Sequence, residues 1–365
     1  MKKFNTFFCS IFIVLQFLFL FIYFSVSLAE ESQKTVDLAY EYCRIVDVAP
    51  ASGPIPANLL SYKGYLYESI RIQSSAELLR AMRAGSEEDL SDEQKGLFKA
   101  FNHGSSDNMK KRLSYASECN IPDNSISVYL LDTTFIQGVE RSKLRNDLWP
   151  MAIGNKIILS CIDRSPTDTA SLLAHETSHT VDNINLNLID YGKDKRHHLN
   201  EVSTKSTAFS EGWAIFNQYY DFPSTAMLPS KLMYETASSA FGHPDYVMRS
   251  LTDSEVAPED FLKTEGVVSE ILFHIAHQIP DGFDKIFKSF LKIRNDNSKD
   301  ITSLINVLLD SYPEDSKKIM EIFARDTASR FSSEEFKKSF PNHFKDIHKK
   351  KSLIKIKHSL FRRGS

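Results

Sequence analysis

The chain has 365 residues, enough for two average domains or one large one. Hydrophobic residues make up 42% and charged residues 25%, which argues against a disordered, collagen-like or multi-span membrane protein. A net charge of −3 is too balanced for a broad basic surface, so we expect no nucleic-acid partner.

The first 29 residues have the pattern of a secretory signal peptide. Lys2 and Lys3 precede an uncharged run from Phe7 to Leu28, and Ser27 and Ala29 supply the small residues of a cleavage site. The run is about 20 residues long, so an uncleaved signal anchor is the alternative. We therefore expect a secreted, periplasmic or cell-envelope protein that meets the membrane only through this segment, if it stays uncleaved.

Three cysteines lie beyond this segment: Cys43, Cys119 and Cys161. They are too scattered for a CxxC metal site, and an odd number allows at most one internal disulfide. Buried packing is the favoured interpretation, with a Cys43–Cys119 bridge as the alternative.

The region 30–122 is predicted to be mainly helical. Pro50, Gly53, Pro54 and Pro56 indicate an irregular lead-in over 30–57. From Leu59 to Met82 apolar residues recur at helical spacing, and two amphipathic stretches follow over 86–102 and 107–118.

The region 123–280 is predicted to form the central part of the protein. Two strands are expected, over 125–131 and 156–162, where β-branched and large apolar residues are bounded by turn residues. Helical patterns follow over 167–182, 201–220 and 264–278.

Further helices are predicted over 283–294, 301–309 and 315–327, within a C-terminal helical region 281–344. The basic tail 345–365 is interpreted as solvated rather than as a contact for an anionic surface. The expected fold is mainly α, of the α+β class, with a small sheet beside the helix 167–182.

The chemistry-bearing residues are His175-Glu176-Thr177-Ser178-His179. On a helix, positions i and i+4 share one face, so both imidazoles can bind one zinc ion while Glu176 lies beside the open coordination position. Glu176 can take a proton from zinc-bound water, whose pKa the metal lowers to about 7, and pass it to a leaving amine. The alternative is that both are ordinary histidines on a half-buried helix. Three features argue against it: uncharged neighbours, a preceding strand and a helix start at Pro166.

A catalytic zinc normally has three protein ligands and a water, so a third ligand is needed. A third histidine in the metzincin pattern is excluded, because position 182 is Asp and position 185 is Asn. Glu211, in Ser-Glu-Gly-Trp-Ala, is the first choice, with an exposed acid on a packed helix as the alternative. Gly212 and Ala214 are expected to let this helix approach the HETSH helix, while Trp213 and Phe216 fill the core on its other side.

HETSH followed by SEGWA resembles the gluzincin-type zinc metallopeptidases, which include thermolysin and aminopeptidases whose third-ligand motif reads Glu-Gly-aromatic-Ala. The resemblance covers 172–216 and implies that His175, His179 and Glu211 bind zinc and that Glu176 is the base. It also implies that 123–280 forms a zincin-like metallopeptidase core, with its site between two helices beneath an edge strand. The 31 residues between His179 and Glu211 exceed the thermolysin-like spacing, so Glu201 is the second choice of ligand and Glu265 a distant third.

Supporting residues are less sharply indicated. Asp182 shares the metal face of the helix and can hold a ligand histidine through its second ring nitrogen, or it can be solvated at the helix end. Peptidases of this type often use a Tyr, His or Arg side chain to stabilise the transition-state oxyanion. The candidates, which the sequence does not rank, are Tyr219, Tyr220, His243, Tyr246 and His274. His197 and His198 are assigned to a solvated loop.

The sequence therefore predicts an exported zinc metallopeptidase that acts on a peptide or protein substrate. The alternative is a catalytically silent, zinc-bearing binding protein of the cell envelope, in which four ligands close the zinc site. The substrate, the choice between endo- and exopeptidase action and the oligomeric state are not indicated.

Overall fold

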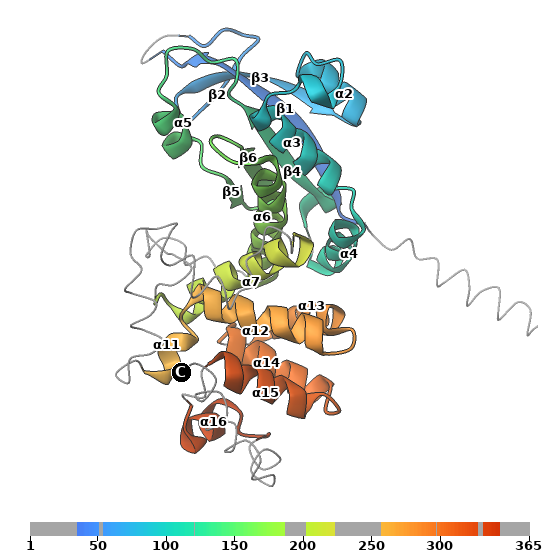
Figure 1. The fold of residues 1–365 in the computed structure, drawn as a ribbon, viewed down its shortest axis with the longest axis vertical. Helices are drawn as coiled ribbons and strands as arrows, with labels where there is room; N and C mark the ends of the chain where they lie inside the picture. The colour runs from blue at the N-terminus through green and yellow to red at the C-terminus, as the bar shows by residue number, and fades with distance from the viewer. Residues whose placement is uncertain are drawn as a thin grey trace, which may run out of the picture. The chain divides into compact units, whose positions relative to one another are not determined.

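A computed structural model describes residues 35–50, 54–119, 121–186, 202–222, 257–296, 298–327 and 331–343. They form an α+β fold, mainly helical, with one six-stranded sheet (Figure 1). In these ranges no helix is both long enough and apolar enough to cross a membrane. The predicted signal segment 1–29 and the basic tail 345–365 lie outside the described residues.

The six strands of the sheet lie between Asp37 and Ser160. The strand order is β2-β3-β1-β4-β6-β5, and β1 pairs in parallel with β4, as does β4 with β6. The other pairs are antiparallel. The strands are β1 (Asp37–Val48), β2 (Leu60–Tyr62), β3 (Tyr65–Ile72), β4 (Ser125–Asp132), β5 (Met151–Ile153) and β6 (Lys156–Ser160).

The two expected strands are confirmed as β4 and β6, and the sheet contains four further strands that were not expected. The irregular lead-in expected over 30–57 contains β1, and the helix expected from Leu59 to Met82 is instead the hairpin β2–β3 followed by α2 (Ser75–Ala81). Lys63 and Gly64 carry the hairpin turn, because both have positive φ, 46° and 82°. This turn reverses the chain between β2 and β3. The apolar residues on either side of it happen to recur at helical spacing, so the sequence pattern did not reveal the turn.

Strand β1 is buried on both faces of the sheet. Tyr40 and Tyr42 belong to the large core, whereas Cys43 and Ile45 belong to a smaller cluster with Leu144 of α5 (Arg141–Asp147). Side chains alternate across a strand, so the two clusters lie on opposite faces. A strand covered on both sides loses the apolar–polar alternation that marks a half-exposed strand.

All three described cysteines, Cys43, Cys119 and Cys161, are free and buried. The packing interpretation is confirmed and the alternative Cys43–Cys119 disulfide is wrong.

The helices expected after residue 86 are confirmed within four residues at each end, except that α3 begins six residues later than expected, because Ser91 caps its start. The long helix α6 packs against α3, β6 and α7, and α7 packs in turn against α12, which also contacts α13 and α15. The helices are α3 (Asp92–His103), α4 (Asp107–Ala116), α6 (Pro166–Leu186), α7 (Lys205–Asp221), α11 (Pro258–Phe261), α12 (Glu265–Gln278), α13 (Gly282–Lys292), α14 (Ile301–Ser311), α15 (Ser316–Asp326) and α16 (Ser333–Ser339).

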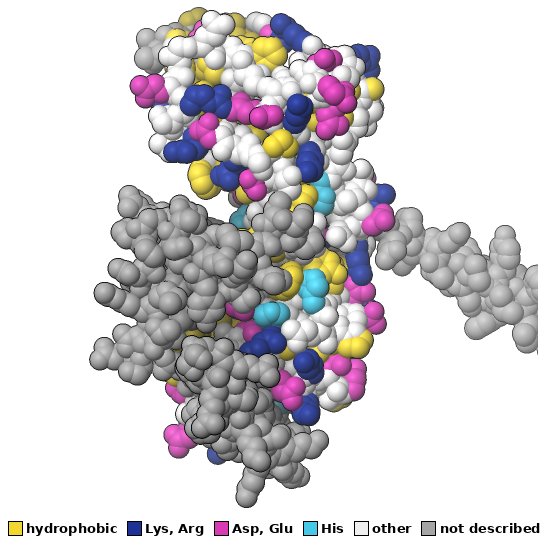
Figure 2. Space-filling view, in the orientation of Figure 1, with side chains coloured by type: hydrophobic (Ala, Val, Ile, Leu, Met, Phe, Trp, Pro, Cys, Tyr) yellow, Lys and Arg dark blue, Asp and Glu magenta, His cyan; other side chains and the backbone are white. Residues whose placement is uncertain are grey.

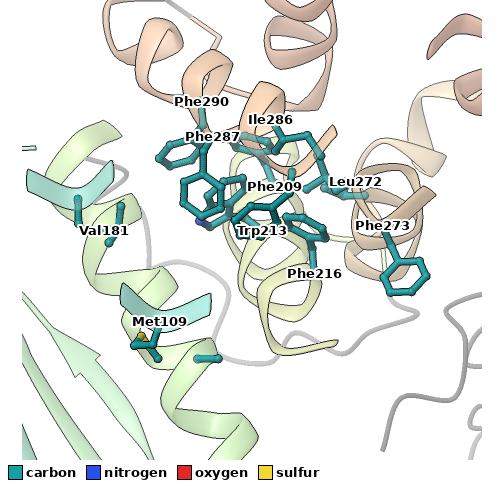
Figure 3. Packing of buried hydrophobic residues seen from close by; sticks show 14 of the residues in the cluster. Met109, Val181, Phe209, Trp213, Phe216, Leu272, Phe273, Ile286, Phe287 and Phe290 are labelled. Carbon is teal, nitrogen blue, oxygen red and sulfur yellow. The ribbon is translucent and has the colours of Figure 1, made fainter. Parts of the chain in front are cut away.

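Aromatic packing joins α7 to α13. The ring of Trp213 stacks on Phe290, with centroids 4.1 Å apart, and lies 4.7 Å from the ring of Phe287 (Figure 3). Trp213 and Phe216 are fully buried, which confirms their predicted place in the core. Large aromatic surfaces removed from water are a main source of core stability.

A buried ion pair joins α4 to the end of α7. The Arg112 guanidinium donates from Nη1 and Nη2 to the Asp221 carboxylate at 2.7 and 2.8 Å, and from Nε to Asn217 at 2.9 Å. Burial raises the pKa of Asp221, but Arg112 and His103 overcome this effect and lower it to about 2. The pair is fully buried, and the guanidinium contacts both carboxylate oxygens. This geometry fixes the position of α7 relative to α4.

On the face shown in Figure 2, basic and acidic side chains are interspersed over the described surface, without a large patch of one sign. This distribution agrees with the balanced composition.

The two tryptophans of the chain provide a matched stability test. Replacing Trp213 by Ala is expected to lower the free energy of unfolding by about 3–5 kcal/mol, because it leaves a cavity between α7 and α13. Trp149 is 54% exposed, so Trp149→Ala should cost at most about 1 kcal/mol, through its contact with Arg164. Urea unfolding followed by far-UV circular dichroism measures both; equal losses would contradict the packing described.

Candidate metal centre

Helix α6 presents the HETSH residues from an almost completely buried position. Ser165 Oγ accepts a hydrogen bond from the N–H of Asp168 at 3.1 Å, and Pro166 occupies the first turn, where its missing N–H has no cost. The hydroxyls of Thr177 and Ser178 donate to carbonyls one turn earlier, at 2.6 and 2.7 Å. These bonds allow a polar helix segment to pack inside the protein.

Three side chains converge from two helices. His175 Nε2 and His179 Nε2 lie 3.0 Å apart, and Glu211 Oε2 from α7 lies 3.6 and 3.2 Å from them. The His179 and Glu211 side chains are 8% and 6% exposed, whereas His175 is 16% exposed. The cluster is therefore buried, and its more open side is at His175.

This triangle of atoms fits a zinc ion. With Zn–N and Zn–O bonds of about 2.0–2.1 Å, a tetrahedral site has ligand atoms about 3.3 Å apart, and the observed distances lie around that value. The two imidazole nitrogens face each other and the same carboxylate oxygen, which suits a shared cation. Two histidines and one carboxylate also form a donor set with an open fourth position.

The pKa shifts of His179 and Glu211 also favour a positive charge within the cluster. Burial lowers the pKa of His179, but Glu211 overcomes this and raises it to about 9. Burial raises the pKa of Glu211, but His179 and His175 hold it well below its ordinary value. The buried carboxylate thus depends on a positive charge at the imidazoles, supplied by a proton or by a bound cation.

A second layer of polar contacts lies behind His179. The Ser210 hydroxyl donates to Asp182, and Ser210 Oγ lies 3.4 Å from His179 Nδ1, a long separation for a hydrogen bond. Asp182 is fully buried, and burial raises its pKa to about 6 despite the bond from Ser210. Because the Ser210 hydroxyl donates to Asp182, its oxygen faces His179 Nδ1 as an acceptor, and the charge of Asp182 helps to raise the pKa of His179.

Glu176 is 5% exposed and follows His175 on α6. Burial raises its pKa, while the two histidines oppose the rise, and Arg164 opposes it more weakly. A raised carboxyl pKa suits a group that both accepts and returns a proton. Ser210 and Arg164 were not expected to act here; only the adjacency of Ser210 to Glu211 and of Arg164 to the helix start hinted at them.

Gly212 faces a different neighbour from the one expected. A Cβ atom there would lie 2.6 Å from Val268 Cβ and 2.8 Å from the Glu265 carbonyl oxygen, both in α12. The expectation that Gly212 lets α7 approach the HETSH helix is therefore wrong: the glycine makes room for α12. Glu211, one residue earlier, points to α6 instead.

The other candidates are distributed elsewhere or lie outside the described residues. Glu265 is buried at the start of α12 and is not part of the cluster. His274 pairs with Asp326, and Tyr220 stacks on Phe283. The candidates outside the described residues are His197, His198, Glu201, His243 and Tyr246.

Comparisons of the chain with protein-family models, with curated proteins and with solved structures find no match.

The close approach of α7 and α12 can be tested at Gly212. Gly212→Ala is expected to lower the free energy of unfolding by about 1–3 kcal/mol. The new methyl group would clash with the Glu265 backbone carbonyl, which can move only if α12 shifts. Adding Val268→Ala should recover part of the loss. Gly85→Ala is the control, since its methyl group meets only the Asp89 side chain, at 3.2 Å. Chemical unfolding measures all three; an unchanged Gly212→Ala variant would contradict this packing.

Proposed function

We propose that the protein is a zinc metallopeptidase that hydrolyses peptide bonds of a peptide or protein substrate. The observation that carries the proposal is the convergence of His175, His179 and Glu211 at 3.0–3.6 Å, with Glu176 next to His175. This arrangement supports the gluzincin resemblance. Export through the N-terminal segment remains part of the proposal.

The three clustered residues would hold the metal, and Glu176 would manage the protons. A bound zinc ion supplies a Lewis acid and lowers the pKa of water to about 7. Glu176 takes a proton from the attacking water and donates it to the leaving amine. Asp182 and Ser210 orient His179, and Arg164 contributes positive charge on the side of Glu176.

The sheet offers a place for an extended substrate. Strand β5 is at the end of the sheet order, pairs on one side with β6 and contacts α6. An edge strand can bind an extended peptide through main-chain hydrogen bonds. A peptide added there would run beside the helix that carries Glu176.

The rival function, a binding protein with a closed zinc site, needs a fourth protein ligand. Within the described ranges the cluster has three. Hydrolysis requires an open fourth position, whereas the rival function requires that position to be filled by the protein.

Metal content tests the ligand assignment. Full-length protein carrying His179→Ala or Glu211→Gln is expected to bind one equivalent of zinc less per chain than the wild type, because each change removes one of three ligands. Inductively coupled plasma mass spectrometry after equilibration with buffered Zn²⁺ measures the difference. The exposed His277→Ala variant is the control. Identical zinc content in all four proteins would refute the site.

Peptide cleavage tests the role of Glu176. Glu176→Gln should retain its zinc and lose about 10²–10⁴-fold in kcat, because the amide cannot accept the proton from water. Glu87→Gln, at an exposed position, should leave cleavage unchanged. A peptide library with mass-spectrometric readout reports both; undiminished cleavage by Glu176→Gln would sink the mechanism.

A further inference from the structure

A second cluster of metal-binding side chains lies away from the HETSH site, between α12 and α15. Glu270 and His274 are four residues apart on α12, so they share one face of that helix, and Asp326 ends α15. Each offers one ligand atom, and the three atoms lie within 4.8 Å of one another. The two helices pack against each other (Figure 1).

Glu270 is the unusual member of this cluster. It is only 8% exposed, and among the described residues it has no hydrogen bond or ion pair. A buried carboxyl group without a donor is costly unless a cation or a proton compensates it.

Asp326 is already oriented towards the cluster. Its Oδ1 accepts from Arg325 Nε at 2.7 Å, while its Oδ2 lies 2.8 Å from His274 Nδ1 and 3.3 Å from Arg325 Nη2. Its side chain is 1% exposed, and that of His274 is 18% exposed. Arg325 thus contacts both oxygens of the carboxylate and holds its orientation, and His274 is the more exposed of the two paired side chains.

We propose that Glu270, His274 and Asp326 form a second site for a divalent transition-metal ion. One imidazole and two carboxylates are donors that suit Zn²⁺ or Mn²⁺. Two buried carboxylates, one of which has no donor while the other is shared with Arg325, match the charge of such an ion. The ion would bridge α12 and α15, and this site is independent of the proposed peptidase activity.

The test uses full-length protein, Zn²⁺ and Mn²⁺ as separate probes, and metal content per chain. The wild type is expected to bind two equivalents of Zn²⁺, and His179→Ala one. Glu270→Gln should also bind one, and Glu270→Gln combined with His179→Ala none. Glu270→Gln keeps the shape of the side chain and removes its charge, so the fold is expected to persist, which far-UV circular dichroism verifies.

Matched histidines on α12 give a second readout. In the His179→Ala background, excess Zn²⁺ or Mn²⁺ should raise the melting temperature, and His274→Ala should abolish that rise. His277→Ala, at an exposed position three residues further, should preserve it. A His179→Ala protein that is folded, binds neither ion and shows no shift overturns the second site while leaving the HETSH site intact. Loss of metal only in the HETSH variants has the same meaning.

Discussion

The site depends on the placement of α7 between α6 and α12. Glu211 and Gly212 are neighbours in sequence and therefore point about 100° apart around the helix. Glu211 reaches the histidines of α6, and Gly212 lets the backbone of α12 approach. A shift of α7 away from α12 would change the distance between Glu211 and His179, so the geometry of the three-residue cluster and the core packing are set by one helix position.

Several parts of the structure hold α7 in that position. Trp213 stacks on Phe290 of α13, and Arg112 of α4 binds Asp221 and Asn217 near the C-terminal end of α7. Glu211 lies two residues before Trp213 on the same helix and is 6% exposed, so its carboxylate has little freedom to move. If Glu211 binds a metal as proposed, a carboxylate held in this way would lose little conformational entropy on binding, which would favour affinity. The buried charge is in turn tolerated because the histidines compensate it.

The sequence revealed the helices and the HETSH–SEGWA pair because both signals are local. Apolar periodicity located α6, α7 and α12 within a few residues, and the i, i+4 spacing placed His175 and His179 together. It failed for β1–β3, since a strand buried on both faces shows no alternation and the Lys63–Gly64 turn interrupts what resembles a helical spacing. Contacts between distant segments were also hidden. The Ser210 bond to Asp182 and the fit of Gly212 against α12 depend on how helices pack, which spacing along one helix does not contain.

The cluster of His175, His179 and Glu211 was predicted from the sequence, whereas the cluster of Glu270, His274 and Asp326 was not. Both place side chains four residues apart on one helix and add a carboxylate from another. After His175 comes Glu176, a buried acid able to move protons, whereas after Glu270 comes Ile271, which has no such chemistry. Only the first arrangement combines the proposed metal ligands with a neighbouring acid, so only the first matches a catalytic motif. A cation at the second cluster would instead join α12 to α15, and since α12 packs on α7, it would stabilise the helix against which Gly212, and with it Glu211, is positioned.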